Sequence, residues 1–127
     1  MNSKSANVIE VTINYSIMDL LTDAEIYDLY IDTTGDIPVI RTDSFHIFRS
    51  DGLSQVLIIP PAMSLCKEGT IMAMFYAEHG LGFYHRPSLS LLEEGLIEEY
   101  GDYRESVLTH LFDLWCEDNN VRILVDD

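Results

Sequence analysis

The excess of acidic over basic side chains is the strongest constraint on how this chain can fold. The sequence has 22 Asp and Glu residues against 7 Lys and Arg, which gives a net charge of −15. Repulsion among these carboxylates favours solubility but opposes a compact state. A stable fold therefore depends on how much apolar surface the rest of the chain can bury.

The composition nonetheless predicts a folded chain. Hydrophobic residues make up 47% of the 127 residues, with seven Tyr and five Phe among them, which is more than disordered chains contain. A domain of this length buries roughly two thirds of its unfolded surface and needs no disulfide or metal. We expect residues 1–127 to form a single domain.

The sequence also bears on the compartment. The apolar run 56–59 ends at two prolines, far short of the roughly 20 residues that a membrane helix needs. Residues 1–7 are polar and lack the apolar centre of a secretory signal. Cys66 and Cys116 have no CxxC spacing, and two free thiols are favoured over a disulfide. We expect a cytoplasmic protein that does not contact a membrane.

Local patterns predict the first elements. Apolar and polar residues alternate over 9–15, which indicates a strand. Thr22 and Glu25 form a capping box, which predicts a helix that begins there and ends near Gly35. A turn that begins earlier, near Ser16, is the alternative.

The middle of the chain predicts extended structure. Residues 38–40 are expected to be a short strand, and residues 45–49 and 55–59 flank a turn signal at 50–52, which predicts a hairpin. The second arm is continuously apolar and is expected to be a central strand covered on both faces.

Residues 62–79 allow two interpretations. They fit a helix with Gly69 as a weak point, or a strand over 70–77 that turns near Gly80 into residues 83–85. Aromatic and β-branched content, together with the glycines, favours the hairpin.

The last third predicts helices and a strand. Capping boxes at 90–93 and 102–105 predict two helices, the first running towards Tyr100 and the second beginning after Gly101. Residues 121–125 alternate as a final strand. Apolar residues recur at helical spacing along the second helix: Val107, Leu108, Leu111, Phe112, Leu114 and Trp115.

Together these elements predict an α+β domain. Its core would be a mainly antiparallel β-sheet with two or three helices packed on it, in a single pair of layers.

Acidic residues gather in two stretches that contain almost no bases. Residues 19–36 hold six acids and no Lys or Arg, and residues 93–118 hold nine acids with Arg104 as the only base. Like charges four positions apart destabilise a helix by a few tenths of a kcal/mol, and an ordinary solvated surface would interleave lysine. In the predicted helices this spacing joins Asp28 and Asp32, Glu94 and Glu98, and Asp113 and Glu117.

The helix dipole explains only some of these acids. Carboxylates near the start of a helix are favoured by the dipole, whereas those near its end are not. Asp113, Glu117 and Asp118 follow the predicted helix to its end, so another demand on them is expected. Tyr100 and Tyr103 stand among these acids, where they either anchor a partner or fill the corner between two helices.

These features predict a protein that binds a basic partner and is not an enzyme. In composition the chain resembles the small acidic immunity proteins that bacteria pair with toxin nucleases, and the likeness implies an inhibitor that occludes the basic groove of a toxin or nuclease domain. A nucleic-acid mimic that blocks a restriction or CRISPR-type effector, or a secretion chaperone, is the alternative. The residues expected to bind the partner are Glu93, Glu94, Glu98, Glu99, Tyr100, Asp102, Tyr103, Asp113, Glu117, Asp118, Asp28 and Asp32.

Few signals of chemistry oppose this interpretation. The chain lacks the basic surface needed for direct nucleic-acid binding, and it has no phosphate loop, GxSxG or HExxH motif. His79 and His85 with Glu78 could be drawn around a metal, and a histidine with Cys66 as a nucleophile pair, but neither spacing is a recognised one. We expect no metal and no cofactor.

Overall fold

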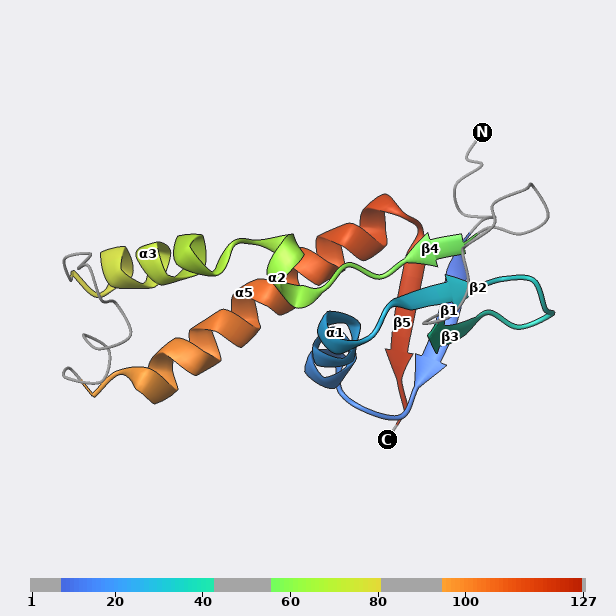
Figure 1. The fold of residues 1–127 in the computed structure, drawn as a ribbon, viewed down its shortest axis with the longest axis horizontal. Coiled ribbons are helices and arrows are strands. Elements are labelled where there is room, and N and C mark those ends of the chain that lie inside the picture. The colour runs from blue at the N-terminus through green and yellow to red at the C-terminus, as the bar shows by residue number, and fades with distance from the viewer. Residues whose placement is uncertain (1–7, 43–55, 81–94, 127) are drawn as a thin grey trace.

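The computed structural model describes residues 8–42, 56–80 and 95–126 (Figure 1). The described chain contains helices and strands in an α+β arrangement, as the sequence predicts. In chain order they are β1 (Ile9–Ile13), α1 (Ile17–Ile26), β2 (Leu29–Asp32), β3 (Val39–Thr42), β4 (Val56–Ile58), α2 (Ala62–Leu65), α3 (Glu68–Glu78), α5 (Ile97–Asp118) and β5 (Val121–Val125).

The strands form two small sheets. β2 is the centre of an antiparallel sheet, with β3 on one side and β4 on the other. β1 pairs with β5 in parallel, with Ile9 opposite Val121, so the two ends of the described chain meet in one ladder. The predicted strand over 9–15 is confirmed for Ile9–Ile13, and the final strand over 121–125 is confirmed in full.

The molecule is elongated (Figure 1). The strands and α1 lie at one end, and the second half of α5 contacts α1, α2 and β5 there. The first half of α5 continues away from the strands beside α3, which runs in the opposite direction. We call α3 together with residues 97–107 of α5 the arm.

One cluster of buried side chains joins the strand end to the arm. Every member of this cluster in the described part of the chain is hydrophobic. The largest fully buried members are Leu20, Leu21, Ile31, Ile59, Ile71, Phe75, Tyr76, Leu108 and Phe112. The arm and the strand end therefore share a core, which fixes the direction of α5.

The first helix begins earlier than the capping box predicts. Ser16 caps α1, since its Oγ accepts a hydrogen bond from the Asp19 backbone N–H at 3.1 Å. Thr22 lies inside the helix, where its hydroxyl donates to the Met18 carbonyl at 2.8 Å. The box prediction is wrong, and the alternative start near Ser16 is confirmed, because only the earlier helix turns Leu20, Leu21 and Ala24 into the core.

Residues 62–78 are largely helical, so the preferred hairpin is wrong. Ile71, Phe75 and Tyr76 are buried along one side of α3, and this helical spacing outweighs the β-branched and aromatic content. Gly69 lies in the first turn of α3, where it interrupts no later turn. Residues 83–85 lie outside the described residues.

α5 is one continuous helix, so the predicted break after Gly101 is also wrong. A Cβ added at Gly101 would meet no atom within 4 Å, which means that this residue faces open space. The side chains of Tyr100, Leu108, Phe112 and Cys116 are buried on both sides of it, and this packing outweighs the weak helix propensity of glycine. The box at 90–93 lies outside the described residues.

β4 is an edge strand of its sheet within the described chain, and not the central strand that its apolar run predicts. β2 occupies the centre, and Ile58 is 63% exposed. The short strand predicted at 38–40 is confirmed as part of β3. The first arm of the predicted hairpin, residues 45–49, falls in a segment that the structure does not describe.

Candidate functional site

Acidic side chains form a line along one exposed face of α5. Successive members are three, four or eight positions apart, and these spacings return to the same side of a helix. From Glu98 to Glu117 the line spans roughly 28 Å at the helical rise of 1.5 Å per residue. We call these residues the acidic row, and all of them are exposed: Glu98, Asp102, Glu105, Asp113 and Glu117.

The centre of the row is a shallow hollow on the helix surface. Three acids of the row line it, together with Ser106, Thr109 and His110. All the lining residues belong to α5 and none is apolar. The hollow is therefore an open polar surface, suited to contact with a charged partner and not to enclosing a small apolar ligand.

The described arginines pair with acids outside the row. Arg41 binds Asp32 at 2.9 Å, Arg104 binds Glu68 at 2.8 Å, and Arg122 binds Glu10 at 3.0 Å. No described Lys or Arg forms an ion pair with a member of the acidic row. The charge of the row therefore stays uncompensated within the described chain.

The row opposes the helix that carries it. Glu98 and Asp102 are four positions apart, as are Asp113 and Glu117, and each such pair destabilises a helix by a few tenths of a kcal/mol. The last turn of α5 has no basic residue, so Glu117 and Asp118 also face the negative end of the helix dipole. Glu98, in the first turn, is favoured by the helix dipole, whereas Asp113 and Glu117, in the second half of α5, gain nothing from it.

Tyr100 and Tyr103 join α5 to α3. The Tyr100 hydroxyl donates to the Glu68 carboxylate, and the Tyr103 hydroxyl donates to Glu78 Oε2 at 3.0 Å. Tyr100 is only 9% exposed, and Tyr103 is half-buried. Both rings pack inside the arm, so Tyr100 offers little surface to a partner in this conformation.

Phe75 is the centre of this aromatic packing. Its ring centroid lies 4.1 Å from that of His79, 5.3 Å from that of Tyr103 and 5.4 Å from that of Tyr100. Nδ1 of His79 lies 3.0 Å from the Phe75 carbonyl oxygen, and Nε2 lies 3.3 Å from Glu99 Oε2. Glu99 therefore belongs to the arm contact and not to the acidic row.

The described structure adds no support for a metal site or for a nucleophile pair of Cys66 with a histidine. In residues 8–42, 56–80 and 95–126, no group of three or more His, Cys, Asp or Glu residues could hold a metal ion. Cys66 and Cys116 are both free thiols, and burial together with the Asp113 charge raises the pKa of Cys116 to about 12. His85 is not among the residues that the structure describes.

The Glu68 carboxylate is the electrostatic centre of the arm. Burial raises its pKa, but hydrogen bonds from Arg104 and Tyr100 and the Arg104 charge together hold the pKa below the ordinary value of 4.5. Burial first, and then the neighbouring Glu68, raise the pKa of Tyr100. Near neutral pH, Glu68 is therefore charged and Tyr100 keeps its proton, the states in which their hydrogen bond forms.

Replacing Glu68→Gln should remove a pH-dependent part of the stability. A carboxylate whose pKa is lower in the folded state stabilises the fold above its unfolded pKa, and this contribution disappears as the pH falls through the folded pKa. Urea unfolding should show the variant less stable by about 1 kcal/mol at pH 7, because water partly screens the pair. The difference should shrink below pH 4.5, the ordinary value for this carboxyl group. The control is Glu105→Gln, at an exposed carboxylate that forms no ion pair with the described arginines, and a difference for Glu68→Gln that is constant from pH 7 to pH 3 would contradict the assignment.

The other predicted site residues are dispersed. Asp32 accepts hydrogen bonds from the Thr34 backbone N–H at 2.9 Å, the Thr34 hydroxyl at 2.6 Å and Arg41, so it stabilises the β2–β3 connection. Asp28 is exposed between α1 and β2, so the prediction that it shares a helix with Asp32 is wrong. Asp118 is exposed at the last residue of α5. Glu93 and Glu94 lie in a segment for which no structure is described.

Sequence reasoning missed some residues that matter here. Glu105 was expected only to cap a helix, whereas it lies within the acidic row three positions after Asp102. The three-residue spacing from Asp102 would have placed Glu105 on the same helix face, but only if α5 had been predicted as one continuous helix. Glu68 and Glu78, the carboxylates that bind the two tyrosines, had no sequence signal, because the contacts join residues 32 and 25 positions apart.

Comparison of the chain with protein-family models, with curated proteins and with solved structures gave no match. Among the described helices, none combines the length and the apolar character needed to cross a membrane.

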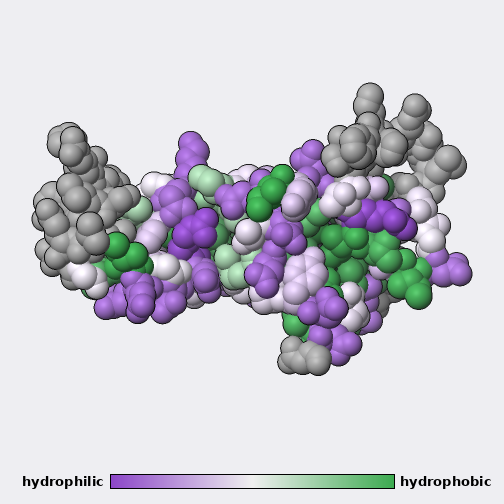
Figure 2. Space-filling model, turned by 60° about the horizontal axis from the view of Figure 1, so that its bottom comes forward, coloured by the Kyte–Doolittle hydropathy of each residue, from purple (hydrophilic) through white to green (hydrophobic). Residues whose placement is uncertain are grey.

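The surface differs between the two ends of the molecule. Figure 2 shows mainly hydrophilic side chains on the visible side of the arm and hydrophobic side chains gathered over the strands.

Proposed function

We propose that this protein is a cytoplasmic inhibitor that works by binding and not by catalysis, and that it covers the basic substrate groove of a partner protein. The observation that carries the proposal is the acidic row. It presents carboxylates along one exposed helix face, while Arg41, Arg104 and Arg122 are paired elsewhere. A cationic surface would neutralise the row and remove its internal repulsion.

The mechanism is occlusion. The acidic side chains lie on a helix that is packed against α3 at one end and against the strands at the other, so the row is held straight before it meets a partner. This preorganisation reduces the entropy lost on binding. The charges also steer the encounter, which makes the association rate fast at low salt. A groove that holds phosphates in the partner would then be filled by carboxylates.

The favoured partner is a toxin such as a nuclease, with this chain as its immunity protein or antitoxin. Such a partner must hold anionic substrate, and its own groove supplies the cationic side chains that the row requires. Tyr103, which is half-buried beside the row, can contribute aromatic contact at the edge of the interface.

A second candidate is a nucleic-acid mimic that blocks a restriction or CRISPR-type effector. The shape of the row favours it: the acids extend along the helix, and the residues between them in the central hollow are small or polar. Carboxylates four positions apart on a helix are about 5–6 Å apart at Cβ, close to the spacing of phosphates along a strand. A compact acidic patch built around exposed aromatic residues would have favoured the immunity type more strongly.

Affinity capture followed by salt titration tests the proposal. The full chain is immobilised, partners are captured from a lysate and identified by mass spectrometry, and the association rate is measured with the purified partner. The rate should fall at least about tenfold as NaCl rises from roughly 0.05 M to 0.5 M, where the screening length shortens severalfold. Tight binding that ignores ionic strength would contradict the proposal, and the activity that the protein suppresses separates a toxin from a restriction or CRISPR-type effector.

A further inference from the structure

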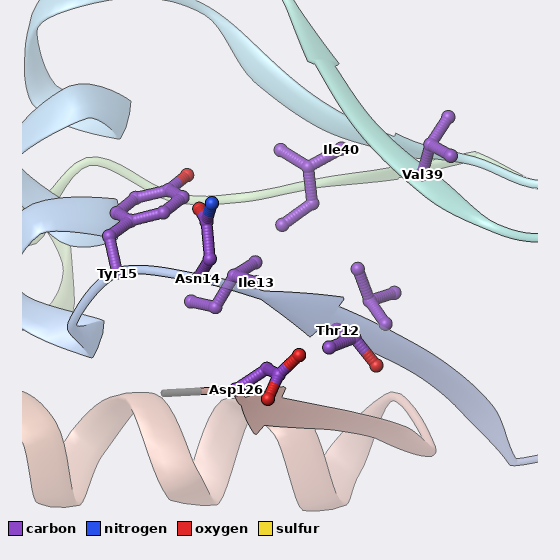
Figure 3. A pocket seen from close by; sticks show the side chains of 8 residues that line it. Thr12, Ile13, Asn14, Tyr15, Val39, Ile40 and Asp126 are labelled. Atoms are coloured by element: carbon purple, nitrogen blue, oxygen red, sulfur yellow. The ribbon is translucent and has the colours of Figure 1, made fainter.

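A hollow of about 480 Å³ lies at the surface between the two sheets, where β1 passes close to β3 (Figure 3). Its floor consists of two core side chains, Val11 and Ile13, which are 3% and 7% exposed. Val39 and Ile40 line it from β3 and are half-buried, and the half-buried Tyr15 ring lies at one end. We call this hollow the socket.

The socket differs from two other hollows because its floor reaches the core. The hollow on α5 is lined by polar side chains that are exposed or half-buried. A second polar hollow, beside Asn119 and Asn120, also has no buried residue among its described lining residues. A side chain that enters the socket therefore contacts the core and loses its water, which is the environment of the residues that dominate binding energy at interfaces.

The rim of the socket is polar. Thr12, Asn14 and Asp126 line it with exposed side chains, and no Lys or Arg is among the described lining residues. The Asp126 backbone N–H donates to the Ile13 carbonyl at 2.7 Å, which fixes this part of the rim beside the floor. An apolar centre inside a polar rim is the arrangement of an interface hot spot, where the rim keeps water from the centre.

The acidic row supplies only part of the affinity that a tight inhibitor needs. An exposed ion pair raises an association constant by about 1.4- to 5-fold, so five of them give at most roughly 3,000-fold. Nanomolar binding corresponds to an association constant of about 10⁹ M⁻¹. Surface charges mainly accelerate the encounter, whereas most differences in affinity between related complexes lie in the dissociation rate. Tight inhibition therefore requires a desolvated apolar contact in addition to the row.

The tyrosines of the arm do not provide this contact. Tyr100 is only 9% exposed, and Tyr103 is half-buried with its hydroxyl bound to Glu78. The apolar group must then come from the partner and find a receptor on this chain. Figure 2 shows the hydrophobic side chains over the strands and the hydrophilic side chains over the arm in one view, so a single partner can reach both ends of the molecule.

We propose that the socket receives an aromatic side chain of the basic partner while the acidic row contacts its basic groove. The ring packs on Val11, Ile13 and Ile40, with Tyr15 beside it as an aromatic neighbour. An aromatic side chain suits the socket because it buries a large apolar area and loses little rotamer freedom. The identity of the partner rests on the proposed function. A second copy of this chain is disfavoured as the occupant, because each copy carries a charge of −15.

The first test uses the free full-length chain labelled with ¹⁵N and three probes: N-acetylphenylalaninamide, N-acetylalaninamide and N-acetyl-lysinamide. The phenylalanine probe should shift the amide signals of Thr12, Asn14 and Ile40 with a Kd of about 1–10 mM, and the other two should bind there at least about tenfold more weakly. Asp126→Asn should leave binding of the uncharged ring unchanged. Equal binding of the lysine probe at these amides, no saturable shift there, or signal changes confined to α5 would overturn the proposal.

A variant that fills the socket gives an independent test. Asn14 is exposed, and its side chain lies beside Tyr15 in Figure 3, so Asn14→Trp should occupy the space while the chain still folds. It should bind the phenylalanine probe at least about tenfold more weakly and dissociate from the basic partner at least about tenfold faster, with an unchanged association rate. Thr70→Trp, which adds the same ring at an exposed position of α3, should behave as wild type.

The outcomes separate the socket from the proposed function. Wild-type probe binding by a folded Asn14→Trp variant would contradict the socket, and signals at Thr12 and Ile40 that change on dilution of the free protein would assign the socket to a second copy and also contradict it. Neutralising the acidic row should slow association with the partner and leave probe binding intact. Failure of the proposed function is therefore seen without loss of probe binding.

Discussion

Neutralising the centre of the acidic row should weaken binding of the basic partner by about 3- to 150-fold. The variant carries Asp102→Asn, Glu105→Gln and Asp113→Asn, the three acids that line the hollow on α5. An exposed ion pair contributes about 0.2–1 kcal/mol, so three of them sum to about 0.6–3 kcal/mol. The loss should appear mainly in the association rate, and the salt dependence of that rate should flatten.

The fold should tolerate these changes. All three side chains are exposed, and their removal relieves repulsion along α5, so the free energy of unfolding should stay within about 0.5 kcal/mol of the wild-type value. A matched control removes the same charge elsewhere, at three exposed acids outside α5, with Glu25→Gln, Asp36→Asn and Asp126→Asn. Equal losses of affinity in the two variants would show that net charge, and not the row, drives binding.

Replacing Phe75→Ala should have the largest effect on stability, a loss of about 3–5 kcal/mol in the free energy of unfolding. The Phe75 side chain is 1% exposed, and three rings surround it with centroids 4.1–5.4 Å away. Truncation leaves a cavity that the helices of the arm can close only in part, because Tyr100 and Tyr103 are also held by hydrogen bonds to α3. Urea unfolding followed by circular dichroism measures the loss.

Met74→Ala is the matched control. Met74 precedes Phe75 in α3 and is 42% exposed, so its truncation should cost less than about 1 kcal/mol. Hydrogen exchange adds a local readout: amides 97–107 of α5 should exchange faster in Phe75→Ala, because the arm loses its packing. Similar stabilities for the two variants would contradict the role assigned to Phe75.

Phe75→Ala should also affect the proposed function, because the core of the arm supports part of the acidic row. The first half of the acidic row lies on the arm, at Glu98, Asp102 and Glu105, and the contact between α3 and α5 holds that half in line with Asp113 and Glu117. Loosening the arm should therefore weaken binding of the basic partner even at temperatures where the rest of the protein remains folded.

Local patterns in the sequence predicted the helices and strands that depend only on a few neighbouring residues. Alternation identified β1 and β5. The mixture of strand and helix periods gave the α+β class. These features depend on a few neighbouring residues, so no knowledge of the rest of the chain was needed.

Packing decided the elements for which local signals conflicted. Residues 68–78 are rich in aromatic residues but are helical, because Ile71 and Phe75 reach the core only at helical spacing. Thr22 and Glu25 form a valid capping box, yet the helix begins after Ser16, because the earlier start buries Leu20 and Leu21. Propensities of a few tenths of a kcal/mol yield to burial energies of a few kcal/mol.

The sequence alone determined that this protein carries many carboxylates and few bases. Only the tertiary structure decided which carboxylates form ion pairs within the protein. Asp32, Glu68 and Glu10 each pair with an arginine, while no described arginine pairs with the acidic row. The row exists because α5 continues through Gly101, which aligns residues 98–117 on one face. That continuity comes from contacts with residues distant in sequence, which no local pattern of residues encodes.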